Sequence, residues 1–592
     1  MATTKSPQLK RLEIPYIDGC NMAIGANISK KQELKIAENA RGNKIGTITK
    51  RAGYRRLGNE ITSTANFGIY YFDGAGKNMY RVSTISATTS IYYLNNSSTW
   101  TALAGGGTSL SAATCDFVEA EGNLFVVNGT DVNRYIQADG TTVITSATAT
   151  GHLYNSPKAF KINYFKDRLY AGDYYTSTTR NKTSIMKSSE PLGIVGLVDG
   201  DHTTIAIASV IKVTDTKYIQ TSDTLDVYRG GVKIADITTN AKTEDTITIA
   251  SVTMAVGTDF NSSDEIWVNG TYTGTRVFRW ADNPATGENV KQYDTMKLTG
   301  GDNSALTLMT NIGNVMMIAN KYNLATFNGT EPIPTSFDLG IGCISSQGWV
   351  KALGSLFFIG HNGMYVTSGG QPKLISAKIQ PLFDGASKTG LEGSAMGVKG
   401  LSIFASIGDV TLHNDNGSID RTLSNVVIEN NLRTENWSYH TGIDAKFFNK
   451  YITSTDIERL EYCGSSGHVY EFLYGTDDNN TNEIPFRIDT GKITLAKNFE
   501  NISYPKEIIL ESDRGTGIKC FISLDGNNFY ELKGESQSGC TVFKVTTFGD
   551  NEEPARCRSI NISFREFSKT TCSISRFAII YASTLEEEEH RN

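Results

Sequence analysis

The stretch Phe357-Phe358-Ile359-Gly360-His361-Asn362-Gly363-Met364-Tyr365-Val366 decides the fold. Two runs rich in apolar, aromatic and β-branched residues flank a polar turn that contains Asn-Gly, a pattern typical of a β-hairpin. The same arrangement occurs at residues 125–135, where Phe125-Val126-Val127-Asn128-Gly129 precedes Val132-Asn133-Arg134-Tyr135. Each pair of runs therefore predicts two adjacent antiparallel strands of one small sheet.

The first strand of this hairpin belongs to a weak repeat, in which a turn residue introduces a short strand carrying an aromatic residue or Met. Successive units lie 41–47 residues apart, except for one step of 146 and one of 66. A period of about 40–45 residues is the size of a four-stranded propeller blade. We therefore predict an all-β chain with a β-propeller of six to eight blades; the alternative is an array of generic β-sandwiches. The seven units end at Tyr80, Phe125, Tyr170, Met316, Phe357, Phe404 and Tyr470.

The 146-residue step is too long for one blade, and its surplus lies at residues 192–290. Five short alternating runs in that segment predict an inserted small β-sandwich or barrel domain. After the last repeat, strand-like runs over residues 496–585 predict a C-terminal β-sandwich. The remaining predicted segments are an N-terminal arm (1–60) with a strand and a short helix near residues 29–41, the two propeller parts (61–191 and 291–495) and an acidic tail (586–592).

Composition limits the function classes. The chain has 592 residues, with 56 Lys and Arg against 62 Asp and Glu, so its formal charge is −6. This balance argues against a protein that wraps nucleic acid through a basic face. No apolar run approaches the roughly 18 residues that span a bilayer, and Met1-Ala2-Thr3-Thr4-Lys5-Ser6-Pro7 lacks the apolar segment of a secretory signal. We expect synthesis in a cytoplasm, with or without release by lysis.

Cysteine and histidine patterns predict no metal site. The eight cysteines contain no CxxC pair, and the seven histidines show no ligand spacing. Reduced thiols are the expectation, with one or two disulfides in the C-terminal stretch as the alternative. Nucleophile-elbow, phosphate-loop and dinucleotide-binding motifs are also missing from the sequence. We therefore predict no enzymatic activity and no cofactor. The four C-terminal cysteines are Cys520, Cys540, Cys557 and Cys572.

Three turns resemble known sites. Ser523-Leu524-Asp525-Gly526-Asn527-Asn528-Phe529 is loosely similar to the Ser-x-Asp-x-Gly-x-x-aromatic turn of sialidase propellers, but lacks Gly at the required place and occurs once. Residues 73–76 (Asp-Gly-Ala-Gly) and 128–131 (Asn-Gly-Thr-Asp) have the composition of calcium loops. We interpret all three as hairpin turns.

One local concentration of charge stands out. Lys50, Arg51, Arg55 and Arg56 surround Tyr54. Four cations are too few for a nucleic-acid surface, and basic residues on strands often meet acidic partners in an assembly. We predict that these five residues form an assembly interface; a solvated surface and a DNA contact are the alternatives.

These features also resemble a known family. Residues 37–58, with the pattern Asn…Gly…Lys-Arg-x-Gly-Tyr-x-x-Leu-Gly, are similar to the N-terminal stretch of the tail hub or nozzle proteins of short-tailed, podovirus-type bacteriophages. Ala52 stands where that family often has Pro. The resemblance covers most of the chain apart from the insert, which matches nothing in the family. It continues at residues 340–348, 356–360, 362–365, 375–379, 437–439 and 464–470.

The resemblance implies a structural virion protein built on a β-propeller. Such a protein forms a ring, expected to be a homohexamer, below the portal and adaptor, where its lumen continues the DNA channel and it takes part in genome retention and ejection. Its expected partners are further copies of itself, the portal and adaptor proteins, tail fibre or needle proteins and transiently passing double-stranded DNA. The expected location is the virion tail, after assembly in the host cytoplasm. The alternative function is a propeller-type receptor-binding or glycan-hydrolysing virion protein.

Overall fold

The computed structural model shows a chain whose regular secondary structure is almost wholly β-strand, arranged in two compact units. One unit comprises Met1–Gly58, Ile344–Ser368 and Pro372–Asn592; the other comprises Asn59–Cys343 and Gly369–Gln371. The predicted acidic tail (586–592) and the turn at 73–76 lie outside the described residues. The structure describes residues 9–15, 17–23, 32–59, 63–72, 78–85, 87–95, 98–146, 152–153, 156–176, 178–188, 194–198, 211–213, 224–229, 232–242, 247–254, 265–268, 278, 280, 295–298, 303–329, 332–334, 340–413, 418–453, 457–479, 481–495, 502–513, 517–537, 540–545 and 555–583.

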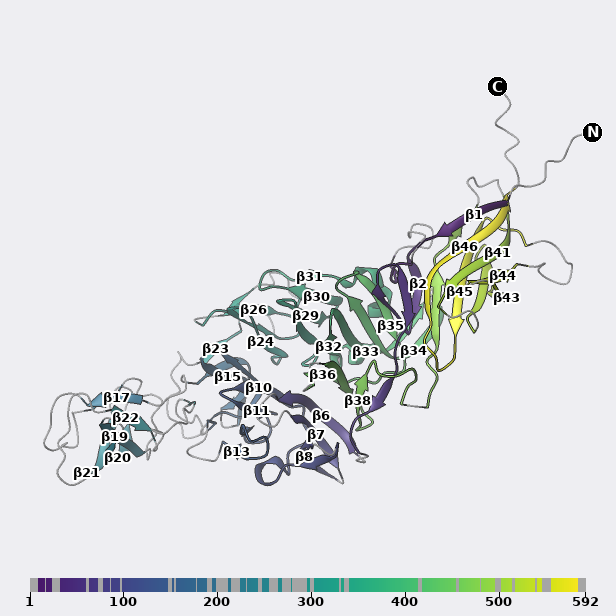
Figure 1. The fold of residues 1–592 in the computed structure, drawn as a ribbon. Coiled ribbons are helices and arrows are strands. Elements are labelled where there is room, and N and C mark those ends of the chain that lie inside the picture. Colours follow the sequence, from purple (N-terminus) through teal and green to yellow (C-terminus); the bar gives the residue numbers. More distant parts are fainter. Residues whose placement is uncertain are drawn as a thin grey trace, which may run out of the picture. The chain divides into compact units, whose positions relative to one another are not determined.

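The unit around Asn59–Cys343 contains four four-stranded antiparallel sheets (Figure 1). Three are meanders of consecutive strands, and the third in chain order takes its last strand from beyond an insertion. Alternating apolar residues of neighbouring strands, such as Leu124 and Ile136, lie buried. The sheets are β6 (Ser63–Phe72), β7 (Asn78–Ile85), β8 (Thr88–Leu94) and β9 (Trp100–Ala102); β10 (Asp116–Ala120), β11 (Asn123–Val127), β12 (Arg134–Ile136) and β13 (Val143–Thr145); β14 (Ala159–Phe165), β15 (Arg168–Thr176), β16 (Thr179–Lys187) and β23 (Thr295–Lys297); and β24 (Leu308–Ile312), β25 (Val315–Ala319), β26 (Leu324–Phe327) and β27 (Pro332–Pro334).

The predicted inserted domain is a sheet of its own. It follows β16 and precedes β23, so it interrupts the third blade between that blade's last two strands. Its six strands pair in the order β18-β17-β22-β19-β20-β21. They are β17 (Ile194–Val198), β18 (Ile211–Val213), β19 (Thr224–Arg229), β20 (Val232–Lys242), β21 (Ile247–Met254) and β22 (Glu265–Val268).

The other unit contributes two further four-stranded sheets. In one of them the outer strand, β5 (Tyr54–Arg56), comes from the start of the chain and pairs with β38. The six four-stranded sheets are the blades of a β-propeller, which confirms the predicted fold class. The two sheets are β28 (Trp349–Ala352), β29 (Ser355–Gly360), β30 (Gly363–Thr367) and β31 (Lys373–Leu374); and β36 (Phe447–Ile452), β37 (Glu458–Cys463), β38 (Val469–Phe472) and β5.

A further meander of the same form, β32 (Ala395–Lys399), β33 (Ser402–His413), β34 (Ile419–Asn431) and β35 (Asn436–His440), belongs to a larger sheet. The repeat units that end at Tyr80 through Phe404 all begin the second strand of a meander. The unit that ends at Tyr470 is instead a third strand, β38. The second strand of this meander is β37, whose aromatic residue Tyr462 lies 58 positions after Phe404. The step is therefore shorter than 66 residues but still long, because β33 and β34 have 12 and 13 residues.

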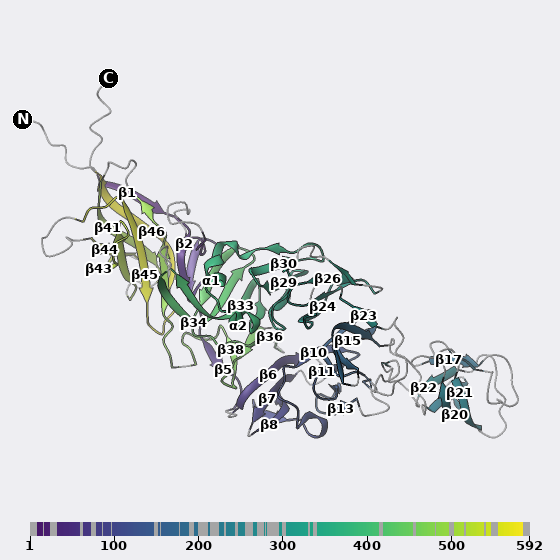
Figure 2. The same ribbon diagram turned by 180° about the vertical axis from the view of Figure 1, so that it is seen from behind.

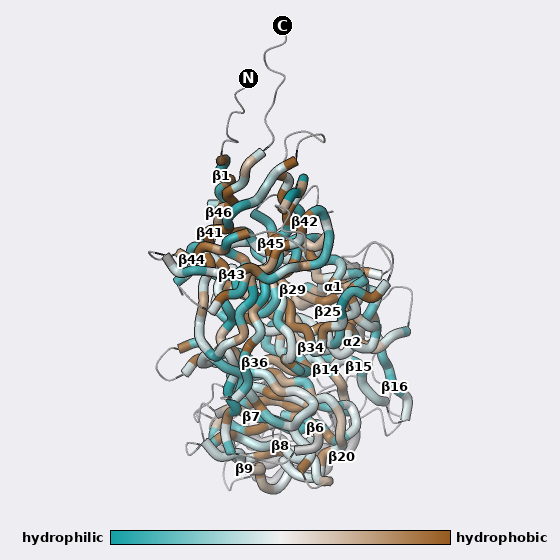
Figure 3. The backbone as a smooth tube through the Cα atoms, turned by 90° about the vertical axis from the view of Figure 1, so that its right-hand side faces the viewer, coloured by the Kyte–Doolittle hydropathy of each residue, from teal (hydrophilic) through white to brown (hydrophobic). Residues whose placement is uncertain are grey.

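The C-terminal β-sandwich is present, and strands from the N-terminus belong to it. β43 pairs with β42 through Tyr530–Leu532 and with β44 through Lys533–Gln537, so it passes from one layer to the other. In Figures 1 and 2, β1 lies along β46. Hydrophobic and hydrophilic stretches follow one another along the strands (Figure 3), and residues such as Ile522, Phe564 and Ile579 are buried between the layers. The strands are β1 (Leu9–Ile14), β2 (Leu34–Glu38), β3 (Ala40–Lys44), β4 (Thr47–Lys50), β39 (Phe486–Thr490), β40 (Ile493–Thr494), β41 (Ser503–Ser512), β42 (Lys519–Leu524), β43 (Tyr530–Gln537), β44 (Cys540–Lys544), β45 (Ser559–Glu566) and β46 (Ser573–Ser583).

The predicted helix near residues 29–41 is wrong over the part of it that the structure describes. Residues 34–38 form β2, which pairs antiparallel with β39, and residues 40–44 form β3. Lys, Glu and Ala favour a helix locally, but ladder hydrogen bonds and burial of Leu34 and Ala37 in the core stabilise the strand instead. In the described part of the chain the helices are short: η1 (Gly105–Gly107), η6 (Ser376–Ile379), α1 (Gln380–Asp384) and α2 (Lys388–Glu392).

All eight cysteines lie within the described residues and carry reduced thiols. Cys520, Cys557 and Cys572 are buried and Cys540 is half-buried. The alternative of one or two C-terminal disulfides does not hold in this structure.

Candidate functional site

A run near the N-terminus, residues 38–56, links separate parts of the unit that contains it. We call it the N-terminal strap. Its start pairs with β39 and β35, its middle forms the β3–β4 hairpin and pairs with β46, and its end supplies β5 to the last blade. Asn39, at φ 52°, turns the chain between β2 and β3. One short segment therefore ties the blade β36–β38 to the sandwich.

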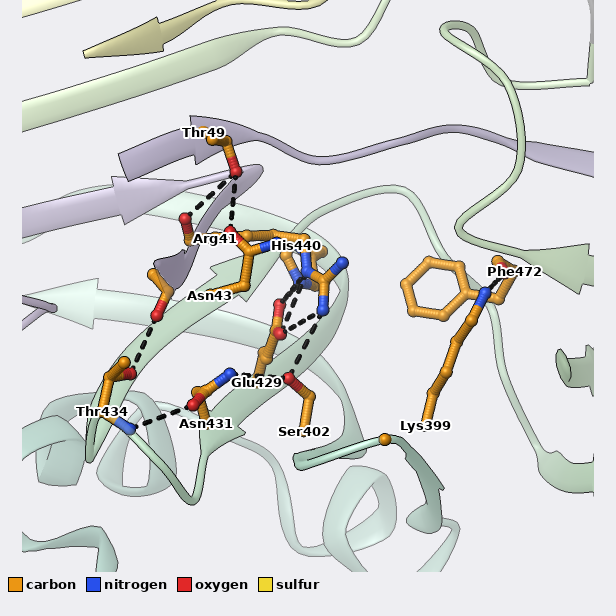
Figure 4. Close-up of polar contacts among 12 residues, drawn as sticks. Arg41, Asn43, Thr49, Lys399, Ser402, Glu429, Asn431, Thr434, His440 and Phe472 are labelled. Atoms are coloured by element: carbon orange, nitrogen blue, oxygen red, sulfur yellow. Dashed lines mark hydrogen bonds and ion pairs between the residues drawn. The ribbon is translucent and has the colours of Figure 1, made fainter. Parts of the chain in front are cut away.

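The strap is anchored near its start by Arg41 (Figure 4). Arg41 Nε lies 3.0 and 2.9 Å from the two carboxylate oxygens of Glu429 on β34, and Nη2 lies 2.7 Å from Oε1. His440 Nε2 lies 3.0 Å from Glu429 Oε2. Glu429 and His440 are almost completely buried. A bidentate guanidinium contact of this kind fixes both distance and orientation.

The protonation states in this cluster follow from its charges. Burial alone would raise the pKa of Glu429, but the charge of Arg41 and the hydrogen bonds from His440 and Arg41 lower it to about 2. Burial lowers the pKa of His440, against the opposing effect of Glu429. The imidazole is therefore neutral near pH 7, and Glu429 is ionised. Ser402 Oγ accepts hydrogen bonds from Arg41 Nη2 (3.4 Å) and Asn431 Nδ2 (3.2 Å). It therefore helps to hold the Arg41 guanidinium in place.

A second anchor starts at the turn before β3. The Asn39 side-chain oxygen accepts a hydrogen bond from Arg51 Nε (2.9 Å), and Arg51 holds both oxygens of Asp478 at 2.7 and 2.6 Å. Glu38 pairs with Arg421 at 2.6 Å. The two ion pairs, Glu38 with Arg421 and Arg51 with Asp478, join residues 383 and 427 positions apart. These polar side chains therefore hold the strap to distant strands by hydrogen bonds and ion pairs.

The five residues predicted as an assembly interface all belong to the strap, and two are buried. Lys50 lies 2.5 Å from Glu566, and Arg51 is in the pair with Asp478; their side chains are 1% and 0% exposed. Their charges are therefore used within the chain. The hydrogen bond from Lys50, together with Ser568, outweighs burial and lowers the pKa of Glu566.

The other three predicted residues lie on β5. The Tyr54 ring packs edge-on against Tyr462 and Tyr470. Arg55 pairs with Glu471 at 2.8 Å, and its guanidinium lies 3.6 Å from the centroid of the Tyr474 ring. Arg56 pairs with Tyr470 in the ladder and is half-buried. An interface role for these three residues stays a prediction.

Sequence reasoning missed most of the anchoring residues. Glu38, Asn39 and Arg41 stand within the stretch that carries the family resemblance, but their partners lie hundreds of residues away. No local spacing connects Arg41 with Glu429 or Arg51 with Asp478. His440 directly follows residues 437–439, another segment of the resemblance, and this was the available signal.

Two of the turns weighed as sites are hairpin turns. Asp525 and Gly526, at φ 50° and 84°, connect β42 to β43, and Asp525 accepts hydrogen bonds from the backbone of Arg558 and Ser559. Asn128 Oδ1 accepts bonds from the backbone of Thr130 and Asp131. The Asp525 carboxylate thus caps the backbone at the start of β45, and the Asn128 amide caps the backbone of its own turn.

The described residues contain no group of three or more His, Cys, Asp or Glu placed to hold a metal ion. No helix among them is long and apolar enough to cross a membrane.

Comparison with known proteins gives structural similarity alone. No family model and no curated protein matches the sequence. Similar solved structures include YCF48 bound to D1 peptide (9% identity, TM-score 0.33, covering 71% of this chain and 95% of that chain). Others are BamB from Moraxella catarrhalis (10%, 0.28, 72% and 100%) and Saccharomyces cerevisiae Sqt1 (10%, 0.32, 71% and 99%). At TM-scores this low, none of these similarities bears on what the chain does.

Proposed function

We propose that this chain is a structural protein of a short bacteriophage tail, a ring-forming nozzle or hub below the portal and adaptor. Its ring, a homohexamer in this proposal, continues the DNA channel and takes part in genome retention and ejection. Its partners are further copies of itself, the portal and adaptor proteins, and fibre or needle proteins. It resides in the virion tail.

The observation that carries the proposal is the N-terminal strap. Residues 37–58 carry the strongest part of the resemblance to tail nozzle proteins, and the strap lies within that stretch. Its charged residues hold distant strands through buried ion pairs, Arg41 with Glu429 and Lys50 with Glu566. Removing one partner of such a pair leaves a buried charge without compensation, at a cost of about 3–5 kcal/mol. Cross-links of this kind suit a protein that must keep its shape while DNA passes under pressure.

The charge of the chain agrees with this role. A formal charge of −6 gives the molecule little attraction for phosphate. A channel wall that holds DNA weakly lets it slide, whereas a basic wall would retain it. DNA is therefore a transient occupant in this proposal and not a ligand.

Immunogold electron microscopy of a phage lysate from the source culture tests the proposal. Antibodies raised against the full chain should label the tail tip below the portal, and antibodies first absorbed with the purified protein should label nothing. Label on lateral fibres or on cell envelopes would contradict the nozzle role. Receptor binding or glycan cleavage would then be the function to assay, by release of sugar from host polysaccharide.

A further inference from the structure

Three neighbouring hairpins in one unit carry large apolar side chains in water. They connect β28 to β29, β32 to β33 and β36 to β37, the first two strands of three successive meanders. Leu353, Leu401, Ile452 and Ile457 are 72%, 41%, 48% and 55% exposed. We call these four residues the apolar tips. Aliphatic side chains gathered on adjacent loops, unlike single exposed ones, mark an interaction surface.

Leu353 is unusual in two ways: its apolar side chain is exposed, and its backbone has a left-handed conformation. It stands at φ 48° and is followed by Gly354 at φ 73°, the geometry of a tight hairpin turn in which Asn-Gly is preferred. A bulky residue in this left-handed region is unusual and strained. An exposed leucine that destabilises its own turn points to a role outside the folded chain.

Equivalent hairpins in the other unit show what the turn itself requires. The connections β10–β11, β14–β15 and β24–β25 have Glu121-Gly122, Lys166-Asp167 and Gly313-Asn314 at the same places. Glu121 has the same φ of 48° as Leu353. These three described hairpins carry polar residues or glycine. A blade can therefore form this turn without an apolar residue at its tip.

The three hairpins lie side by side. Gln347, just before β28, forms a parallel bridge with Ala395, the first residue of β32, so these two strands run in the same direction. β32 in turn packs against β36 and β37. The backbone N–H of Gly400 donates a 2.8 Å hydrogen bond to Glu458 at the end of the next hairpin. Because neighbouring strands run in the same direction, their hairpins open at one edge. The apolar tips therefore form one face.

Basic residues border this face. Lys351, Lys399 and Lys450 each precede a tip by two residues, and Lys450 lies 3.1 Å from Glu458. By sequence the three hairpins hold these lysines and Arg459 against Asp456 and Glu458. Arg459 also pairs with Glu471 at 3.3 Å, and Lys399 donates a hydrogen bond to the carbonyl oxygen of Phe472. With Glu471 counted, four cations stand against three carboxylates, so the face keeps one net positive charge in a chain of net charge −6. The rest of the chain is therefore acidic, and a second copy offers carboxylates to this face.

We infer that the apolar tips, with their bordering lysines, bind an acidic face of a second copy of this chain. Two copies joined tip to tip would bring two net-positive faces together, which is repulsive. The contact is therefore heterologous, head to tail, and such contacts build closed rings or open filaments. The inference rests on the proposed function, in which the chain forms a ring, and names the surface that joins one copy to the next.

Sedimentation velocity of the full chain over a wide range of concentrations tests this inference. The test variant is Leu353→Asn with Ile452→Thr, and the control is Glu121→Asn, which changes the equivalent turn position in another blade. The wild type and the control should self-associate. The test variant should associate at least about tenfold more weakly, since each lost aliphatic contact is worth about 1.5 kcal/mol or more. At a concentration where both proteins are monomeric, its melting temperature should not be below that of the wild type, because Asn suits the left-handed turn position and both side chains are exposed.

Three results would overturn the inference. The first is a wild type that stays monomeric at every concentration, and the second is self-association that the test variant leaves unchanged. The third is binding to vesicles of anionic lipid, lost in the test variant, without self-association; the tips would then serve a membrane. Immunogold label at the tail tip would stand in each case, so failure of the inference is distinguishable from failure of the proposed function.

Discussion

The guanidinium of Arg41 holds both carboxylate oxygens of Glu429, 388 residues later in the chain, while His440 contacts the same carboxylate from β35. Arg41 is on the first strand of the strap's hairpin, and Glu429 is on a strand of the meander β32–β35. The start of the chain is thus locked to strands made much later. Folding of this unit cannot be complete until both are present.

Arg41→Ala should lower the free energy of unfolding of this unit by about 3–5 kcal/mol, because the buried Glu429 carboxylate loses its cation. Urea denaturation followed by tryptophan fluorescence measures the shift. Arg11→Ala is the matched control: its pair with Glu13 is more than half exposed on both sides, so a change below about 1 kcal/mol is expected. Equal effects of the two substitutions would contradict the anchoring role of Arg41.

His152 should make the stability of its own unit, Asn59–Cys343 with Gly369–Gln371, depend on pH. Burial among the rings of Phe125, Tyr135 and Phe278 lowers its pKa to about 4. The unfolded chain takes up this proton near pH 6.5, so the stability is fully present above pH 6.5 and falls between pH 6.5 and 4, by up to about 3 kcal/mol.

Thermal unfolding across this pH range measures the effect. His152→Gln should flatten the dependence, whereas His413→Gln, at an exposed position, should keep it. The same slope in wild type and His152→Gln would show that other groups cause it.

The cysteines should resist modification in the folded protein. Burial raises the pKa of Cys20 and Cys115 to about 12, and it is the largest cause of the same rise at Cys557. The thiolate is the reactive form, so these thiols should react with iodoacetamide only after unfolding. Cys540 is half-buried and should be modified first. Mass spectrometry of the native and the urea-unfolded protein counts the adducts; rapid native labelling of Cys20 would refute the expectation.

Gly53→Ala should destabilise the strap. A Cβ at this position would lie 1.7 Å from the backbone oxygen of Asp477, so the backbone must move. Gly53 also exchanges backbone hydrogen bonds with the segment after β38, through Tyr474 and Gly475. We expect a loss of about 1–3 kcal/mol in urea denaturation. Gly370→Ala, where nothing lies within 4 Å, is the control and should be nearly neutral.

The repeat was predictable because its signals are local. A turn residue followed by an aromatic residue or Met marks the second strand of each meander from Tyr80 to Phe404, and the hairpin geometry needs nothing from elsewhere in the chain. The last unit was misplaced because Tyr462 lacks the glycine-bearing turn, while Tyr470 follows one. The helix near residues 29–41 failed for the opposite reason: pairing with β39, far along the chain, outweighs the local preference.

The sequence alone determined the kind of fold, the position of the insertion and the presence of a C-terminal sandwich, since turn chemistry and the alternation of apolar residues act over a few residues. Only the tertiary structure decided what the basic run at 50–56 does. Arg51 meets Asp478 from 427 positions away, and Lys50 meets Glu566 from 516 positions away. An ion pair depends on a distance in space, and folding sets that distance for residues whose separation in sequence contains no trace of it.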